Sequence, residues 1–148
     1  MRRFQFRYES LLKVNRLRAD EAEREFGLAV RALQEAEYAR DCLRQQKRDH
    51  LSALLEKKRE GALQEIRLLE NYLAKLNADL KLSLQEIAQA ELVVEQRRTQ
   101  FIEAMKKVKT VELLKEQDLE THTQEVTREE GRILDEVGTA LYLRKDGS

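Results

Sequence analysis

The sequence contains little of what builds a compact domain. Among its 148 residues it has no proline, no tryptophan, five glycines, four phenylalanines and four tyrosines. Turns draw on proline and glycine, and aromatic rings fill many cores, so an ordinary globular domain is disfavoured. Apolar residues make up 41% of the chain, which is too many for simple disorder. Charged residues make up 38%, and the combination is typical of long helices or coiled coils.

Other features that the sequence lacks exclude further classes of protein. The longest apolar runs are three or four residues, too short to span a bilayer. The basic N-terminus, MRRFQFRYES, is followed by no apolar core, so we expect no secretory signal peptide. Cys42 is the only cysteine and cannot form an intramolecular disulfide, which favours a reducing cytoplasmic location. The 28 basic and 28 acidic residues balance, which argues against a dedicated nucleic-acid binder.

Two apolar seams of heptad spacing run along the chain, with steps alternating between three and four residues. Ten of fourteen positions are apolar in the first seam and twelve of fourteen in the second. The first seam is Tyr8, Leu12, Asn15, Ala19, Ala22, Phe26, Ala29, Leu33, Ala36, Arg40, Leu43, Lys47, His50 and Leu54. The second is Ile66, Leu69, Leu73, Leu76, Leu80, Ser83, Ile87, Ala90, Val94, Arg97, Phe101, Ala104, Val108 and Val111. The alanine-rich seam and the large-residue seam are complementary, as facing helices should be.

A single glycine separates the two seams. Gly61 follows the basic residues Lys57, Lys58 and Arg59, and a glycine after a basic last turn is a common helix stop. A short connection forces the two helices to run antiparallel. Each paired arm would be about 75 Å long at the rise of an α-helix.

We therefore predict an all-α fold, a long two-helix antiparallel coiled-coil hairpin that occupies residues 1–148 as one domain. Helix 1 is expected at about 5–57, the turn at about 57–63 and helix 2 at about 63–143. The second helix overhangs its partner from about residue 114. Charge is uneven: six bases and one acid lie in the first 18 residues, and nine acids and three bases in residues 112–136. This asymmetry favours the antiparallel orientation more than it adds stability.

No catalytic constellation stands out. There is no glycine-rich phosphate loop, and His50 and His122 have no cysteine or histidine at ligand spacing. Two antiparallel helices also offer no concave pocket. We predict no enzyme activity, no metal site and no cofactor, and we expect His50 to be a tolerated seam residue and Cys42 a small, partly buried one.

Two apolar features lie outside the regular seams. Phe4, Phe6 and Tyr8 alternate along a basic N-terminal segment, which is either a clamp on the second helix or an aromatic-basic patch for a partner. Near the turn, Leu68 and Tyr72 lie one position away from seam residues, so the apolar stripe is wider than one partner helix covers. The widened stripe indicates a further packed element or a docking face.

Three motifs of the chain belong together. The N-terminal motif consists of Phe4, Phe6, Arg7, Tyr8, Glu9, Leu11, Leu12 and Arg16, followed by an acidic and alanine-rich run at 20–25. The other two are the turn at Lys57–Gly61 and the pattern Leu69, Tyr72, Leu73, Leu76. Together these motifs resemble those of the flagellar export protein FliJ family. The resemblance covers the whole chain and implies a stalk-like coiled coil of the type III export apparatus.

The family resemblance also implies partners. Proteins of this family bind and stimulate the hexameric export ATPase, reach the membrane export gate FlhA and bind export chaperones. On this sequence the resemblance assigns ATPase binding to Phe4, Phe6, Arg7, Tyr8 and Leu11. It assigns export-gate binding to Leu68, Tyr72 and Leu76. It implies a cytoplasmic protein, peripheral at the cytoplasmic face of the inner membrane, which meets the membrane only through partners and binds no nucleic acid.

Three alternatives stay open at this point. One is the related stalk protein of a virulence type III secretion system. Another is a helical-hairpin arm that binds nucleic acid through the bases near the turn, which are Arg44, Lys47, Arg48, Lys57, Lys58 and Arg59. The third is a structural coiled coil that associates with itself through the overhang.

Overall fold

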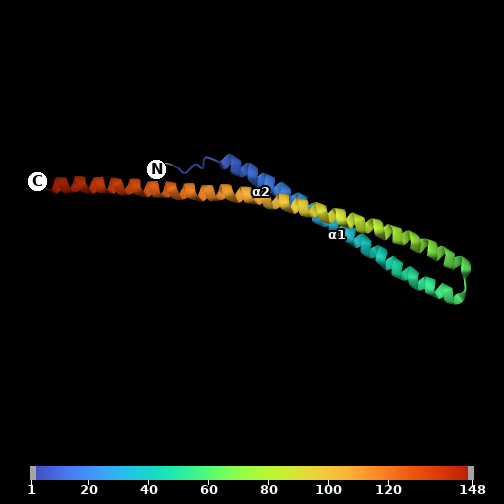
Figure 1. Ribbon diagram of the computed structural model, residues 1–148. Helices are drawn as coiled ribbons and strands as arrows, with labels where there is room; N and C mark the ends of the chain where they lie inside the picture. The colour runs from blue at the N-terminus through green and yellow to red at the C-terminus, as the bar shows by residue number, and fades with distance from the viewer. Residues whose placement is uncertain (1–2, 147–148) are drawn as a thin grey trace. The chain divides into compact units, whose positions relative to one another are not determined.

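Two long helices make up the structure, a computed structural model that describes residues 3–146. Helix α1 covers Glu9–Glu60 and helix α2 covers Leu63–Asp146 (Figure 1). Residues 3–146 contain no strand. The predicted all-α hairpin of two packed helices is therefore confirmed. Over the same residues, neither helix has a stretch long and apolar enough to cross a membrane.

The chain divides into two compact units, and each contains a part of both helices. Unit 1 consists of residues 1–19 and 103–148, and unit 2 consists of residues 20–102. The turn between α1 and α2 belongs to unit 2. The N-terminal segment and the C-terminal part of α2 belong to unit 1.

Gly61 forms the turn because it adopts a backbone conformation that other residues resist. Its φ is 74°, in the left-handed region, and its N–H donates to the Lys57 carbonyl at 3.0 Å. The Ala62 N–H donates to the same carbonyl at 3.3 Å. This is the usual glycine cap of a helix C-terminus, and the cations of the last turn complement the helix dipole.

Opposite effects are expected when alanine replaces two different glycines. Gly61→Ala should lower the free energy of unfolding by about 1 kcal/mol, because an L-residue is strained at this φ. A Cβ at Gly61 meets no atom within 4 Å, so the loss reports backbone strain alone. Gly27→Ala should raise stability by about 0.5–1 kcal/mol, because Gly27 lies inside α1, also with free space around it. Urea unfolding followed by circular dichroism measures both, and equal shifts for the two variants would contradict this account of the turn.

The core of unit 2 lies close to the turn. Leu54 of α1 packs with Leu73 and Leu76 of α2, and Leu43, Ile66 and Leu69 surround this cluster. Farther from the turn, the rings of Phe26 and Phe101 stack with centroids 6.2 Å apart. Large side chains of the two helices thus pack against each other at seam positions where neither helix has an alanine.

The core of unit 1 joins the N-terminal segment to α2. Its buried residues are Phe6, Leu12, Ala19, Val108 and Val111, with Phe4 and Ala104 packed against them. Among the buried residues of the described chain, Phe6 alone lies off the two predicted seams. Phe6 precedes α1, so its burial follows from the path of the segment and not from helical periodicity.

Ion pairs link the two helices in both units. Arg16 contacts Glu112 at 3.3 Å and Lys115 contacts Glu9 at 3.0 Å in unit 1. In unit 2, Arg97 contacts Glu25 at 2.9 Å. All these side chains are partly exposed, so the pairs fix the antiparallel orientation and contribute little stability each.

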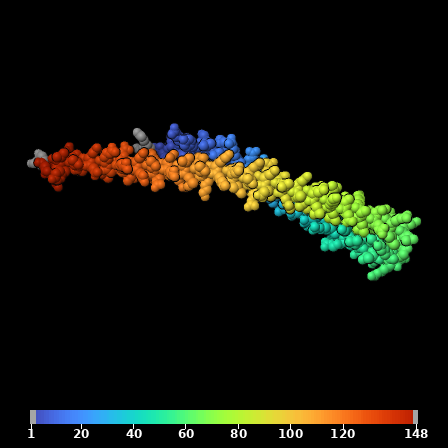
Figure 2. Space-filling view, viewed as in Figure 1, coloured from blue at the N-terminus to red at the C-terminus, as the bar shows by residue number. Residues whose placement is uncertain are grey.

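Helix α2 continues well beyond the residues that the N-terminal segment covers. The Phe4 ring lies 5.5 Å from the His122 ring, centroid to centroid. Every residue from 132 to 146 is exposed, including Ile133, Leu134, Val137 and Leu141. Figure 2 shows this C-terminal part of α2, in red, without a neighbouring helix. We call residues 132–146 the overhang.

Candidate interaction sites

The residues assigned to ATPase binding divide into a buried and an exposed set. Phe6 is buried in the unit 1 core, and its ring meets Tyr8 edge-on at 5.9 Å between centroids. Phe4 is half-buried against the same core. The Lys115 ammonium lies 5.9 Å from the Phe6 ring centroid while it also contacts Glu9. Phe4 and Phe6 therefore clamp the N-terminal segment onto α2, as one of the two sequence interpretations expected.

The other residues assigned to ATPase binding are exposed to solvent, next to the clamp formed by Phe4 and Phe6. Arg7, Tyr8 and Leu11 are all exposed, and the Arg7 guanidinium lies 5.9 Å from the Tyr8 ring centroid. Val14 is also exposed, three residues after Leu11 on the same side of α1. We call Arg7, Tyr8, Leu11 and Val14 the N-terminal surface. Sequence reasoning missed Val14, although its spacing from Leu11 was visible.

The residues assigned to the export gate are similarly divided. Leu76 is 2% exposed and belongs to the unit 2 core, whereas Leu68 is 69% exposed. Tyr72 is 41% exposed, and its ring stacks on His50 with centroids 4.4 Å apart. The His50 Nδ1–H donates to the Gln46 carbonyl at 2.8 Å, which holds the ring in place for this stack. Leu68 and Tyr72 form a surface that Leu76 supports from beneath.

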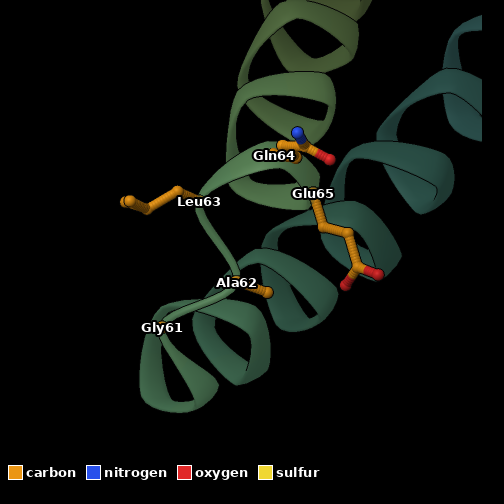
Figure 3. Close-up of a pocket in the computed structure, with 5 residues that line it drawn as sticks. All are labelled: Gly61, Ala62, Leu63, Gln64 and Glu65. Atoms are coloured by element: carbon orange, nitrogen blue, oxygen red, sulfur yellow. The ribbon is translucent and has the colours of Figure 1, made fainter.

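Carboxylates border the same side of the turn. Lys57 contacts Glu65 at 2.9 Å and Glu60 at 3.2 Å. Its hydrogen bonds to Glu65 and then to Glu60 raise the pKa of Lys57, so the ammonium stays charged at neutral pH. A shallow hollow between Gly61 and Glu65 marks the turn (Figure 3). Its open shape and small lining offer no enclosed pocket for a small molecule.

The histidines and the cysteine form no reactive centre. Across residues 3–146 no three metal-binding side chains come together. The Cys42 side chain is exposed, so the expectation of partial burial is wrong. Cys42 points away from the seam because it directly precedes the seam residue Leu43. Its hydrogen bond with Tyr38, one turn earlier, raises the pKa of that phenol.

Comparison with known proteins decides between the interpretations of this hairpin. A family model described as "Flagellar FliJ protein" matches residues 4–147, nearly the whole chain. The chain belongs to the FliJ family. Neither the curated proteins nor the solved structures gave a match.

Membership of the FliJ family gives the chain a place in flagellar protein export, a type III secretion process. The FliJ family is a non-catalytic part of the export apparatus. The match is to the flagellar family, so it favours the flagellar system over the virulence systems.

Proposed function

We propose that this FliJ-family protein is a stalk-like, non-enzymatic coiled coil that binds and stimulates the hexameric export ATPase. It also links the ATPase to the export gate FlhA and escorts export chaperones. It acts in the cytoplasm, at the cytoplasmic face of the inner membrane. The family match over residues 4–147 carries the proposal, and the two exposed surfaces on the paired helices support it.

The N-terminal surface supplies the proposed ATPase contact. It presents Arg7 and Tyr8, two residue types enriched among energetically important interface residues, beside the aliphatic Leu11 and Val14. The buried Phe6 and half-buried Phe4 hold this surface in a fixed conformation before binding. A pre-ordered surface loses less entropy on association than a mobile one.

The surface of Leu68 and Tyr72 supplies the proposed contact with the export gate. Both side chains present apolar area to water, and Tyr72 is already fixed by its stack on His50. Leu76 contributes by holding α2 in place beneath them. The gate contact therefore belongs to unit 2 and the ATPase contact to unit 1.

Titration of the purified chain into the export ATPase tests the ATPase contact. Wild type should raise ATP hydrolysis and saturate near one chain for each ATPase hexamer. Tyr8→Ala with Leu11→Ala should raise the half-maximal concentration on the order of tenfold to a hundredfold, because tyrosine is enriched among the residues that dominate binding and both substitutions remove exposed apolar area. Helical content should stay unchanged, since both side chains are exposed.

Leu17→Ala with Leu28→Ala is the matched control, because it removes exposed apolar residues elsewhere on α1. The control should stimulate like wild type. Loss of stimulation in both variants, or in neither, would remove the N-terminal surface from the proposal. An absence of stimulation by wild type would reject the stalk function itself.

A further inference from the structure

A second stripe of heptad spacing lies on the outside of α1 near the turn. Arg44, Arg48, Leu51, Leu55 and Lys58 follow one another at steps of four, three, four and three residues. These steps place all five side chains on one side of the helix. All five are exposed, and the two leucines are among the exposed large apolar residues. This stripe has no role in the seam or in the proposed gate contact.

Between residues 44 and 60 the acidic residues of α1 lie away from this stripe, and Asp41 borders its first residue, three positions before Arg44. Asp49 and Glu56 are about 100–160° around the helix from Leu51 and Leu55 at the angular step of an α-helix. Glu60 lies there as well, where it contacts Lys57. The stripe from residue 44 to residue 58 therefore presents cations and leucines with no carboxylate between them.

The start of α2 adds to the same surface. Lys57 contacts Glu65, which places Glu65 on the acidic side of the turn. Leu63 is two residues before Glu65, and Figure 3 shows the Leu63 side chain pointing away from the helices while Glu65 points toward α1. Leu63 is 78% exposed, and Arg67 lies one turn after it. We call the α1 stripe together with Leu63 and Arg67 the basic face.

The cations of the basic face have no carboxylate partner. Within residues 3–146 no salt bridge involves Arg44, Arg48, Lys58 or Arg67. Arg48 donates only to the neutral Gln45 side chain, at 2.9 Å. Lys57, on the acidic side, contacts two carboxylates. The positive charge of the basic face is thus available to an anionic partner.

We propose that the basic face binds the surface of a bilayer that contains anionic phospholipids. Exposed cations attract anionic headgroups, and leucines between them can enter the boundary between headgroups and acyl chains. Sequence analysis expected membrane contact only through partners, and the basic face adds a direct one. The proposal rests on the stripe and its unpaired cations and does not depend on the ATPase or gate contacts.

The leucines favour a membrane over a nucleic acid. Phosphate backbones attract cations and hydrogen-bond donors, and exposed bases stack on aromatic rings. The basic face has three leucines and no aromatic ring, so its apolar part would gain little from a nucleic acid. A lipid surface satisfies both the cations and the leucines.

Flotation of the full chain with vesicles tests the proposal. Vesicles of equal parts phosphatidylglycerol and phosphatidylcholine should bind the chain, and pure phosphatidylcholine should not. Arg44→Gln with Arg48→Gln and Lys58→Gln should weaken binding on the order of a hundredfold, since each cation near an anionic surface contributes about fivefold. Lys106→Gln with Lys107→Gln and Lys109→Gln, a matched loss of three exposed cations in unit 1, should weaken it less than about threefold.

A second pair of variants examines the leucines. Leu51→Gln with Leu55→Gln should weaken vesicle binding several-fold, and Leu82→Gln with Leu92→Gln, also exposed in unit 2, should not. Circular dichroism confirms that each variant is folded. Equal binding to anionic and zwitterionic vesicles, or an equal loss of binding in the basic-face triple variant and the unit 1 triple variant, would overturn the proposal. Unchanged vesicle binding by the Leu51 and Leu55 variant, together with displacement by a short DNA duplex, would replace the membrane by nucleic acid.

Discussion

Leu12→Ala is expected to lower the free energy of unfolding by about 2–5 kcal/mol. Leu12 is 0% exposed and packs with Phe6, Ala19, Val108 and Val111. Truncation removes buried contacts and leaves a cavity that two rigid helices cannot close. The same cluster holds the N-terminal segment, so this variant should also lose ATPase stimulation through loss of order in that segment.

The neighbouring residue is the control for stability. Leu11 is 46% exposed, so Leu11→Ala should change stability by no more than about 0.5 kcal/mol. Urea unfolding of the two variants under the same conditions makes the comparison. Similar losses for both substitutions would mean that unit 1 is not packed on Leu12 as described.

Leu76→Ala is the corresponding substitution in unit 2, with an expected loss of about 2–5 kcal/mol. Leu76 is buried with Leu54 and Leu73 close to the turn. Leu68→Ala removes the same side chain from a site that is 69% exposed, and stability should stay within about 0.5 kcal/mol of wild type. Thermal and urea unfolding followed by circular dichroism measure the difference.

Substitutions at Leu68 and Leu76 also distinguish a direct contact with the export gate from structural support of that contact. Leu68→Ala and Tyr72→Ala should weaken binding to the export gate by about tenfold each without loss of helix, because their exposed area is lost directly. Leu76→Ala should weaken gate binding only in proportion to its loss of folded protein. Calorimetric titration at low temperature, where all variants are folded, distinguishes the two. Gate binding unaffected by Leu68→Ala and Tyr72→Ala would sink the assignment of this surface.

The fold was largely predictable because one physical rule governs it. Every buried residue inside either helix falls on the heptad seam, and this includes the polar residues Asn15 and Ser83. The turn could also be predicted, since the chain has a single glycine between residues 28 and 130. That residue, Gly61, adopts a positive φ in the structure. Neither inference needed any contact between distant residues to be known beforehand.

The rule fails where the backbone is not helical. Residues 3–6 precede α1 and follow no helical period, so the sequence left open whether Phe6 was buried or displayed. Its burial depends on how the segment returns to α2. Leu76 was assigned to gate binding by the family resemblance, and its seam position already indicated that it is buried. The sequence marked Arg44, Arg48 and Lys58 only as members of a basic run near the turn, because their separation from Asp49 and Glu56 follows from the helical step and not from the order of residues.

The overhang has a thermodynamic consequence for any partner that packs on it. Residues 132–146 are all exposed, so tertiary packing adds little to their helical stability, and a helical segment of this length without tertiary packing is marginal in water. A partner that covers Ile133, Leu134, Val137 and Leu141 would therefore also suppress fraying of these last turns. Part of its interaction free energy would go into the conformational entropy of ordering, which lowers affinity for a given contact area. Binding through the overhang would be specific and readily reversible, because association and helix formation would be one coupled equilibrium.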